Sequence, residues 1–298
     1  MVNFSGQQDG PGVVLCDGLA CDGFAWRYLR PQLDPHFRVM HLHYRGHGRS
    51  GLPPSVGDCT LPLLARDIEE LMTRTNQPPS TFVGHSMGVQ VTLEMALRYP
   101  ERVRAGVLLC GPHGRALDTF KGFELGARVL PTIRNFVNRY RDAVRTVMGV
   151  LLPTDLAFRV AQAMELNRDF VKQTDFMDYL EHAAKMPPDL FMTLVTDIAE
   201  RTSEHFFDRI RQPMLVVAAE NDGVTPSFTS VEMHKRLPNA EFELIAHGSH
   251  AAIVERPEAV NTCVMGFLER HRLKEPRRSP EVPPMTLGQT FRAAAASA

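Results

Sequence analysis

Residues 84–88 read Gly-His-Ser-Met-Gly, a segment whose residue types and spacing could activate a serine hydroxyl. The apolar run 80–83 before it predicts a short buried strand, and residues 89–97 after it predict a helix. A serine on so sharp a strand-to-helix turn needs small residues two positions before and after it, because strand and helix must cross closely. The turn also places Ser86 at a helix N-terminus, where free backbone N–H groups favour a developing negative charge. These features predict acyl transfer through a serine ester.

A simpler interpretation of this segment is an ordinary turn, because a serine between two such glycines arises by chance in chains of this length. The flanking strand and helix patterns favour the catalytic interpretation. So does the presence of suitable partner residues later in the chain. We therefore take Ser86 as the candidate nucleophile.

A serine hydroxyl is a weak nucleophile at neutral pH, so it needs a base and a third group that orients the base. Asp222 follows the apolar strand pattern 214–219, and His250 lies in the loop after the strand pattern 241–245. Sites in doubly wound sheets form outside the carboxyl ends of the strands, where Ser86, Asp222 and His250 all fall. The chain order Ser, Asp, His is also the one expected for this type of turn.

Two other residues could take these roles. Asp208 could orient the histidine, and His247 could serve as the base. Asp222 precedes a glycine, which is a common arrangement in turns, and His247 lies nearer the strand end, where it can cap or pack. We favour Asp222 and His250.

The oxyanion that forms when serine attacks a carbonyl needs two N–H donors. Met87, directly after the nucleophile, should supply one, and the loop 17–23 after the first strong strand should supply the other. In that loop Gly18 permits a tight turn that leaves the Leu19 N–H pointing toward the pocket. The alternative for Gly18 is a plain Asp-Gly turn with no role in the site.

The elements that must position these residues alternate between strand and helix patterns, which predicts an α/β fold, a doubly wound and mostly parallel sheet. Expected strands include 13–16, 37–44 and 105–110, and 61–73 is an amphipathic helix. The expected domains are a core in two parts, 1–112 and 209–273, an inserted all-helical lid at 113–208, and a flexible tail at 274–298. The lid region is rich in phenylalanine and methionine, including Phe120, Phe123, Phe136, Phe158, Met164, Phe170, Phe176, Met177, Phe191 and Met192.

Composition excludes several function classes. The 298-residue chain has a formal net charge of -1 with acidic and basic residues interspersed, so we expect no nucleic-acid partner and no membrane partner. The five cysteines are scattered and odd in number, which is typical of reduced thiols, and with no apolar leader pattern we expect a cytoplasmic protein. We expect no cofactor and no metal, and Arg277 and Arg278 are expected to belong to a solvated tail.

A histidine-rich segment offers a different reading as a metal site. His41 and His43 would share one face of a strand, and His47 follows. Arg45 stands where a carboxylate ligand would be needed, and His47 is one place late for the usual metallo-hydrolase spacing. We therefore disfavour metal binding.

Taken together, the residues from about 12 to 272 resemble the α/β-hydrolase fold family in element order, nucleophile turn, acid and histidine. The segments 45–50, Arg-Gly-His-Gly-Arg-Ser, and 255–258, Glu-Arg-Pro-Glu, are also typical of the family. The resemblance implies Ser86 as nucleophile, His250 as base and acid, Asp222 as its partner, and Leu19 and Met87 as oxyanion donors. Epoxide hydrolases and haloalkane dehalogenases of this family imply an aspartate at the position of Ser86, which argues against both activities.

The chain departs from the family pattern in three places. Asp17 stands where members usually have a histidine, Tyr44 replaces an acid, and the N-terminal pair of strands is short or missing. We expect Asp17 to pair with Arg45 or His47, a hypothesis that coordinates can test.

The expected function is hydrolysis of a carboxylic ester or lactone of a mainly apolar small molecule through an acyl-enzyme. The same three residues could instead cleave a C–C bond, a thioester or an amide, or support cofactor-free haloperoxidase-like chemistry. A non-enzymatic alternative is a small-molecule sensor that retains the triad. The sequence sets neither the substrate nor the oligomeric state.

Overall fold

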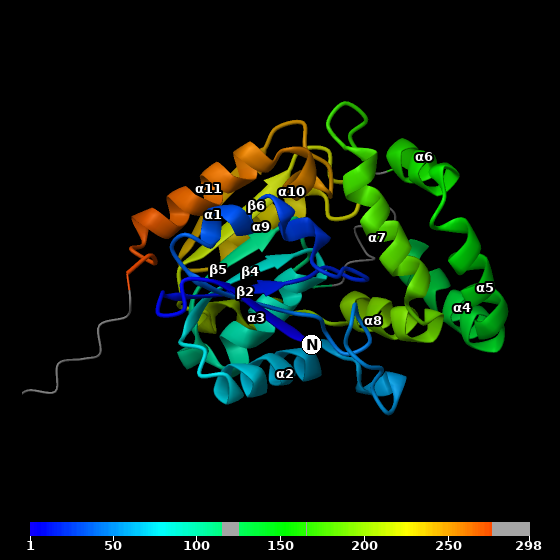
Figure 1. Ribbon diagram of the computed structural model, residues 1–298, viewed down its shortest axis with the longest axis horizontal. Coiled ribbons are helices and arrows are strands. Elements are labelled where there is room, and N and C mark those ends of the chain that lie inside the picture. Colours follow the sequence, from blue (N-terminus) through cyan, green and yellow to red (C-terminus); the bar gives the residue numbers. More distant parts are fainter. Residues whose placement is uncertain (115–124, 165, 276–298) are drawn as a thin grey trace, which may run out of the picture.

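A single twisted sheet forms the centre of the computed structural model, which describes residues 1–114, 125–164 and 166–275 (Figure 1). Its seven strands lie in the order β1-β3-β2-β4-β5-β6-β7. β1 runs antiparallel to β3, and every other neighbouring pair is parallel. The strands are β1 (Val2–Gly6), β2 (Gly12–Cys16), β3 (Arg38–Leu42), β4 (Ser80–His85), β5 (Val103–Leu109), β6 (Met214–Ala219) and β7 (Ala240–Ile245).

Helices cover both faces of this sheet because its central strands are apolar on both sides. In β2, Val14 and Cys16 belong to one core cluster, whereas Val13 and Leu15 belong to the cluster on the opposite face. The first cluster packs under α2 (Leu61–Arg74), α3 (Met87–Arg98) and α9 (Ser227–Arg236). The second packs under α1 (Arg30–Leu33), α10 (Ala252–Glu255) and α11 (Pro257–Arg270). The predicted doubly wound α/β fold is confirmed.

Between β5 and β6 the described residues form helices and no further strand of the sheet. We call this segment the helical insertion. It consists of α4 (Leu125–Arg139), α5 (Arg141–Leu151), α6 (Asp155–Met164), α7 (Gln173–Lys185), α8 (Pro188–Glu200) and the 3-10 helix η6 (Glu204–Arg209). Figure 1 shows α4, α5 and α6 at the end of the molecule farthest from the sheet, with α7 and α8 closer to it. Accordingly α4 packs on α8, α5 on both α7 and α8, and α6 on α7.

Several predicted boundaries differ in detail from the structure. The N-terminal pair of strands was expected to be short or missing, and the structure has one five-residue strand there, β1, which pairs with β3 along its length. A short 3-10 helix, η1 (Phe24–Arg27), precedes α1. Phe120 and Phe123 of the predicted lid lie outside the described residues, as does the predicted tail from residue 276 on, with Arg277 and Arg278. Lys274, at the start of that tail, pairs with Glu269 of α11.

In the described part of the chain, no single helix is long and apolar enough to cross a membrane. Helices α5 and α6 taken together are long and apolar enough by length and composition alone, but they are bent by 92° at their junction.

Candidate active site

Ser86 occupies the sharp turn between β4 and α3, with φ 56° and ψ −121°. This left-handed φ is strained for a residue with a side chain, and surrounding packing must hold it. The flanking glycines make that packing possible. A Cβ on Gly84 would lie 2.2 Å from the Gly88 carbonyl oxygen, and one on Gly88 would lie 2.0 Å from the carbonyl oxygen of Cys16. No side chain fits at either position, so the turn has the form of a nucleophile elbow.

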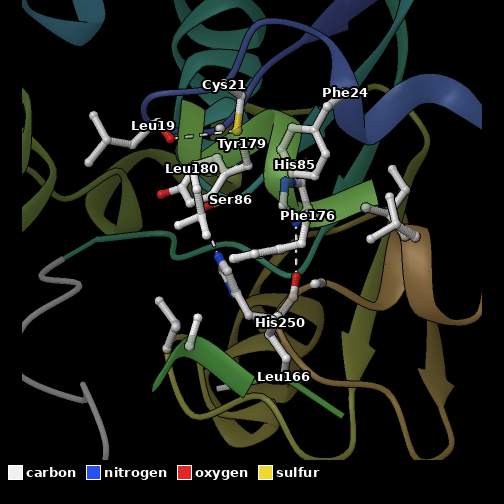
Figure 2. A pocket seen from close by; sticks show the side chains of 16 residues that line it. Leu19, Cys21, Phe24, His85, Ser86, Leu166, Phe176, Tyr179, Leu180 and His250 are labelled. Atoms are coloured by element: carbon white, nitrogen blue, oxygen red, sulfur yellow. Dashed lines mark hydrogen bonds between the residues drawn. The ribbon is translucent and has the colours of Figure 1, made fainter. Parts of the chain in front are cut away.

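The structure brings Ser86, His250 and Asp222 together from three separate loops. His250 Nδ1 lies 3.0 Å and 3.2 Å from the two carboxylate oxygens of Asp222. Its Nε2 lies 2.9 Å from Ser86 Oγ (Figure 2). A carboxylate only accepts hydrogen bonds, so Nδ1 carries the proton. Nε2 therefore carries no proton and can accept the Ser86 hydroxyl proton, which is the geometry that general-base activation requires.

Asp222 is held by three donors from the turn that follows β6. The backbone N–H groups of Val224 and Thr225 donate to Oδ1 at 2.9 Å and 2.7 Å, and the Thr225 hydroxyl donates to Oδ2 at 2.7 Å. Burial by itself raises the pKa of Asp222, but the facing His250 and these hydrogen bonds outweigh it and leave the pKa below its ordinary value. The group is thus a carboxylate at neutral pH.

Thr225 was not among the residues singled out from the sequence. The sequence signal for it was the short spacing Asp-x-x-Thr, in which the aspartate carboxylate can accept hydrogen bonds from the residues of the turn that follows it. The Thr225 hydroxyl contacts both Asp222 and His250, since it also lies 3.4 Å from His250 Nδ1.

The rival residues lie elsewhere. Asp208 belongs to η6, and the carboxylate that contacts His250 is that of Asp222. The side chain of His247 is 67% exposed and faces Glu220 at 3.3 Å. Between the alternatives that the sequence left open, the geometry favours Asp222 and His250.

His85, the residue before the nucleophile, makes a contact that sequence reasoning missed. Its Nε2 donates to the backbone carbonyl of His250 at 3.0 Å, which ties the nucleophile turn to the histidine loop. Its Nδ1 is buried and has no hydrogen-bond partner among the described residues. Burial, together with the nearby His250, lowers the pKa of His85 to about 4, so this ring is neutral at neutral pH.

The two predicted oxyanion donors flank the serine. Met87 is the first residue of α3, where a backbone N–H has no acceptor inside the helix. Gly18 packs against the nucleophile so closely that a Cβ there would lie 3.2 Å from Ser86 Cβ. Leu19, next in the chain, lines the cavities beside Ser86. This arrangement is compatible with both N–H groups receiving an oxyanion.

The expected pairing of Asp17 with Arg45 or His47 is wrong. The buried Asp17 carboxylate instead accepts from the Trp26 indole and from His41 Nε2, the latter at 2.9 Å. Burial raises the pKa of Asp17, but His41 and the Trp26 hydrogen bond outweigh that effect and lower it below its ordinary value. The pairing differs because β2 and β3 are adjacent parallel strands with Leu15 opposite His41, so the residues at their carboxyl ends meet.

Arg45 and His47 have other partners. The Arg45 guanidinium binds Asp67 of α2, at 2.7 Å through Nε, and also the backbone carbonyl of Asp58. His47 is fully buried and donates from Nδ1 to the Arg45 carbonyl at 3.2 Å. These contacts stabilise the loop that follows β3.

The histidines considered as metal ligands are engaged in hydrogen bonds. His41 binds Asp17, and His43 Nδ1 accepts from the backbone N–H of Arg49 at 3.0 Å. Across residues 1–114, 125–164 and 166–275, no group of three or more His, Cys, Asp or Glu side chains is arranged to hold a metal ion.

Two mainly apolar cavities meet at Ser86. The first, of about 340 Å³, extends toward the helical insertion and is bounded by Phe176, Tyr179 and Leu180 of α7 (Figure 2). The second, of about 310 Å³, extends toward α8 and is bounded by Phe191 and Val195. Both cavities are lined by Ser86 and also by Leu19, Tyr179 and Val224. The site can therefore hold two apolar groups on either side of one reacting carbon.

Comparisons with known proteins agree with this architecture. The family model described as alpha/beta hydrolase fold matches residues 11–257. The chain is 25% identical over 296 residues to bifunctional epoxide hydrolase 2 of Sus scrofa, covering 90% of this chain and 53% of that protein. It is 25% identical over 261 residues to the putative carbamate hydrolase RutD of Escherichia coli O9:H4 (strain HS), covering 87% of this chain and 92% of that protein. The chain thus spans about half the length of the pig enzyme and nearly all of RutD.

Solved structures show the same fold. The structure of Est816, described as an N-acyl homoserine lactone degrading enzyme, superposes with a TM-score of 0.70 at 20% sequence identity. The superposition covers 90% of this chain and 96% of Est816. With the family model matching most of its length, this chain belongs to the alpha/beta hydrolase fold family.

Proposed function

We propose that this hydrolase-family protein cleaves a carboxylic ester or lactone of a mainly apolar small molecule through a serine acyl-enzyme. The observation that carries the proposal is the hydrogen-bonded chain Asp222–His250–Ser86, with distances of 3.0 Å and 2.9 Å. It lies where two apolar cavities meet. The serine at the elbow also argues against epoxide hydrolysis, which in this family implies an aspartate there.

In the proposed reaction His250 Nε2 takes the Ser86 hydroxyl proton as Oγ attacks the substrate carbonyl carbon. The tetrahedral oxyanion accepts from the N–H groups of Leu19 and Met87. Nε2 then gives its proton to the leaving alkoxide, the C–O bond breaks and an acyl-enzyme remains. A water molecule, deprotonated by His250, attacks the acyl carbon, and the acid leaves as Ser86 regains its proton.

Asp222 acts through His250 in each step. Its negative charge stabilises the imidazolium that forms, and its acceptance from Nδ1 keeps Nε2 facing the serine. Thr225 and the turn amides hold the carboxylate in place. The lowered pKa of Asp222 supports this role, because the group stays charged at neutral and mildly acidic pH.

The substrate class follows from the shape and lining of the cavities. In the proposal the acyl part occupies the cavity bounded by Phe176 and Leu180, and the alcohol part occupies the cavity bounded by Phe191 and Val195. The helical insertion then acts as the lid of the site. Est816, similar in fold, is described as a lactone-degrading enzyme, and the proposal extends to lactones for this reason.

The test is a panel of nitrophenyl esters of increasing acyl length together with a set of lactones, assayed with the wild-type protein and Ser86→Ala. We expect turnover of esters or lactones by the wild type and none by the variant. Full activity in Ser86→Ala would overturn the mechanism. Adding carbamate, thioester and amide substrates to the panel separates the bond types, and a carbamate is included because RutD is a putative carbamate hydrolase.

A second assay separates catalysis from sensing. A fluorophosphonate should label Ser86 covalently, and mass spectrometry should locate the label on the peptide that contains it. Labelling without turnover of any ester, lactone or other panel substrate would favour a small-molecule sensor over an enzyme.

A further inference from the structure

The outer helices of the insertion carry large apolar side chains on their solvent face. In α4, Val129, Ile133 and Phe136, with Tyr140 at its end, recur at helical spacing and are 39% to 58% exposed. An adjacent stripe of the same helix, Leu130 and Val137, is buried against α8. The helix is therefore apolar over a broad arc, and packing within the described chain covers only part of that arc.

Helices α5 and α6 also carry exposed large apolar side chains. We call the whole set the outer apolar face, and it comprises Val129, Ile133, Phe136, Tyr140, Val147, Val150, Leu151, Leu156 and Val160. Each side chain in it is at least 39% exposed. Figure 1 shows α4, α5 and α6 together at the end of the molecule remote from the sheet. Soluble monomers rarely expose so many large apolar side chains in one region, so a partner is expected there.

The charge of this region indicates the kind of partner. Residues 125–164 contain six arginines and two aspartates, a net of +4 in a chain whose total is -1. The arginines, all exposed, are Arg128, Arg134, Arg139, Arg141, Arg145 and Arg159. Except for Arg141, which contacts Asp142 and Asp189, they form no ion pair with any residue that the structure describes. The even mixture of charges along the whole chain conceals this local excess.

We propose that the outer apolar face docks on an anionic lipid surface. Exposed large apolar side chains combined with arginines, on helices that lie along a surface, are the features of interfacial membrane binding. Anionic headgroups would neutralise the arginines while the apolar side chains enter the acyl boundary. A symmetric contact between two copies would instead bring two faces of charge +4 together.

The geometry points to binding along the surface and not across the bilayer. A spanning helix needs about 20 apolar residues. Helices α5 and α6 have 11 and 10 residues and meet at 92°. Each also carries an arginine in its middle section, Arg145 and Arg159 respectively.

Docking would place the catalytic cavity next to the lipid. Helix α6 presents Leu156 and Val160 outward, whereas its Ala161 lines the cavity beside Ser86. A lipid-dissolved ester could then enter from the side of the membrane. This consequence rests on the proposed function, but the docking itself does not.

The test is flotation with vesicles of equal parts phosphatidylglycerol and phosphatidylcholine, compared with vesicles of phosphatidylcholine alone. Using Ser86→Ala protein keeps the result independent of hydrolysis. We expect binding to the anionic vesicles, weaker binding to the neutral ones, and release as salt is raised. The triple variant Phe136→Gln, Val150→Gln, Leu156→Gln should reduce partitioning by at least about tenfold. Arg134→Gln should reduce it by about fivefold, as should Arg145→Gln.

The matched control replaces equally exposed apolar residues outside the insertion, Leu52→Gln, Phe228→Gln and Leu244→Gln. These changes should leave partitioning within about twofold of the parent. Thermal unfolding followed by circular dichroism checks that all variants remain folded. If the triple variant does not fold, the single variant Phe136→Gln replaces it in the flotation assay.

Three results would overturn the proposal. One is equal partitioning into anionic and neutral vesicles, or none into either. Another is that the variants with substitutions in the insertion partition into anionic vesicles as strongly as the control variant does. The third is a dimer in lipid-free sedimentation that the triple variant converts to a monomer, since the face would then join two copies of the chain.

Discussion

The buried imidazole of His47 should make the protein less stable in mild acid. Its Nδ1 donates to the Arg45 carbonyl at 3.2 Å, and its Nε2 is buried with no hydrogen-bond partner among the described residues. A proton on Nε2 would create a buried charge whose N–H has no acceptor. Burial accordingly lowers the pKa of His47 from 6.5 to about 4.

The sign of the pH effect follows from where the proton binds. Between pH 6.5 and pH 4 the unfolded chain takes up a proton at this residue and the folded chain does not. The free energy of unfolding therefore falls as pH falls through this window. A shift of one pKa unit corresponds to about 1.4 kcal/mol, so His47 alone should remove about 2 kcal/mol of stability at pH 5 and about 3 kcal/mol at pH 4.

The assay is urea unfolding at pH 7.5 and pH 5, followed through the fluorescence of the single tryptophan, Trp26, which is buried in the native core. The perturbation is His47→Gln, whose amide can still donate to the Arg45 carbonyl but does not titrate. Protonation of the other buried histidines lowers the free energy of unfolding of the wild type and of the variant alike. The difference between the two proteins therefore isolates the contribution of residue 47. Between the two pH values the wild type should lose about 2 kcal/mol more than the variant.

Tyr44→Phe is the control, because Tyr44 packs edge-on against the His47 ring and does not titrate in this window, burial having raised its pKa well above 10. Its unfolding free energy should have the same pH dependence as that of the wild type. If His47→Gln lost as much stability in acid as the wild type does, residue 47 would not be the proton-binding group and the reasoning would be refuted.

Three further predictions concern catalysis. Asp222→Asn should leave the fold intact but lower kcat by about 10⁴, because the amide no longer stabilises the imidazolium, and near-normal ester turnover would contradict the role given to Asp222. Thr225→Val removes the 2.7 Å hydroxyl bond to Asp222 and should lower kcat about tenfold at unchanged KM, with Thr225→Ser restoring most of it; a change in KM alone would indicate a purely packing role. Phe176→Ala should enlarge the first cavity and move the preference among nitrophenyl esters toward longer acyl chains. An unchanged dependence of activity on acyl length would contradict the assignment of this cavity to the acyl part.

Much of the sheet and of the candidate site could be predicted because the signals are local. Strong apolar runs such as 214–219 predict buried strands, and the glycines around Ser86 are required by a turn that spans only a few residues. The N-terminal strand could not be placed from the sequence, because β1 has three half-buried and two exposed residues and gains its pairing from β3. An edge strand of this kind carries a weak pattern of its own.

The sequence by itself determined which residue types could form the site, since the motif around Ser86 and the order of Asp222 and His250 are properties of the chain. Tertiary structure alone decided their less regular partners. Asp17 pairs with His41 because two parallel strands end side by side, and His85 meets His250 because a loop 165 residues later folds over it. Helical periodicity likewise gives α4 two apolar stripes, and only packing shows that one is buried and the other exposed. The physical reason is the same in each case: a periodic pattern reports which side chains share a face, whereas burial depends on which other part of the chain covers that face.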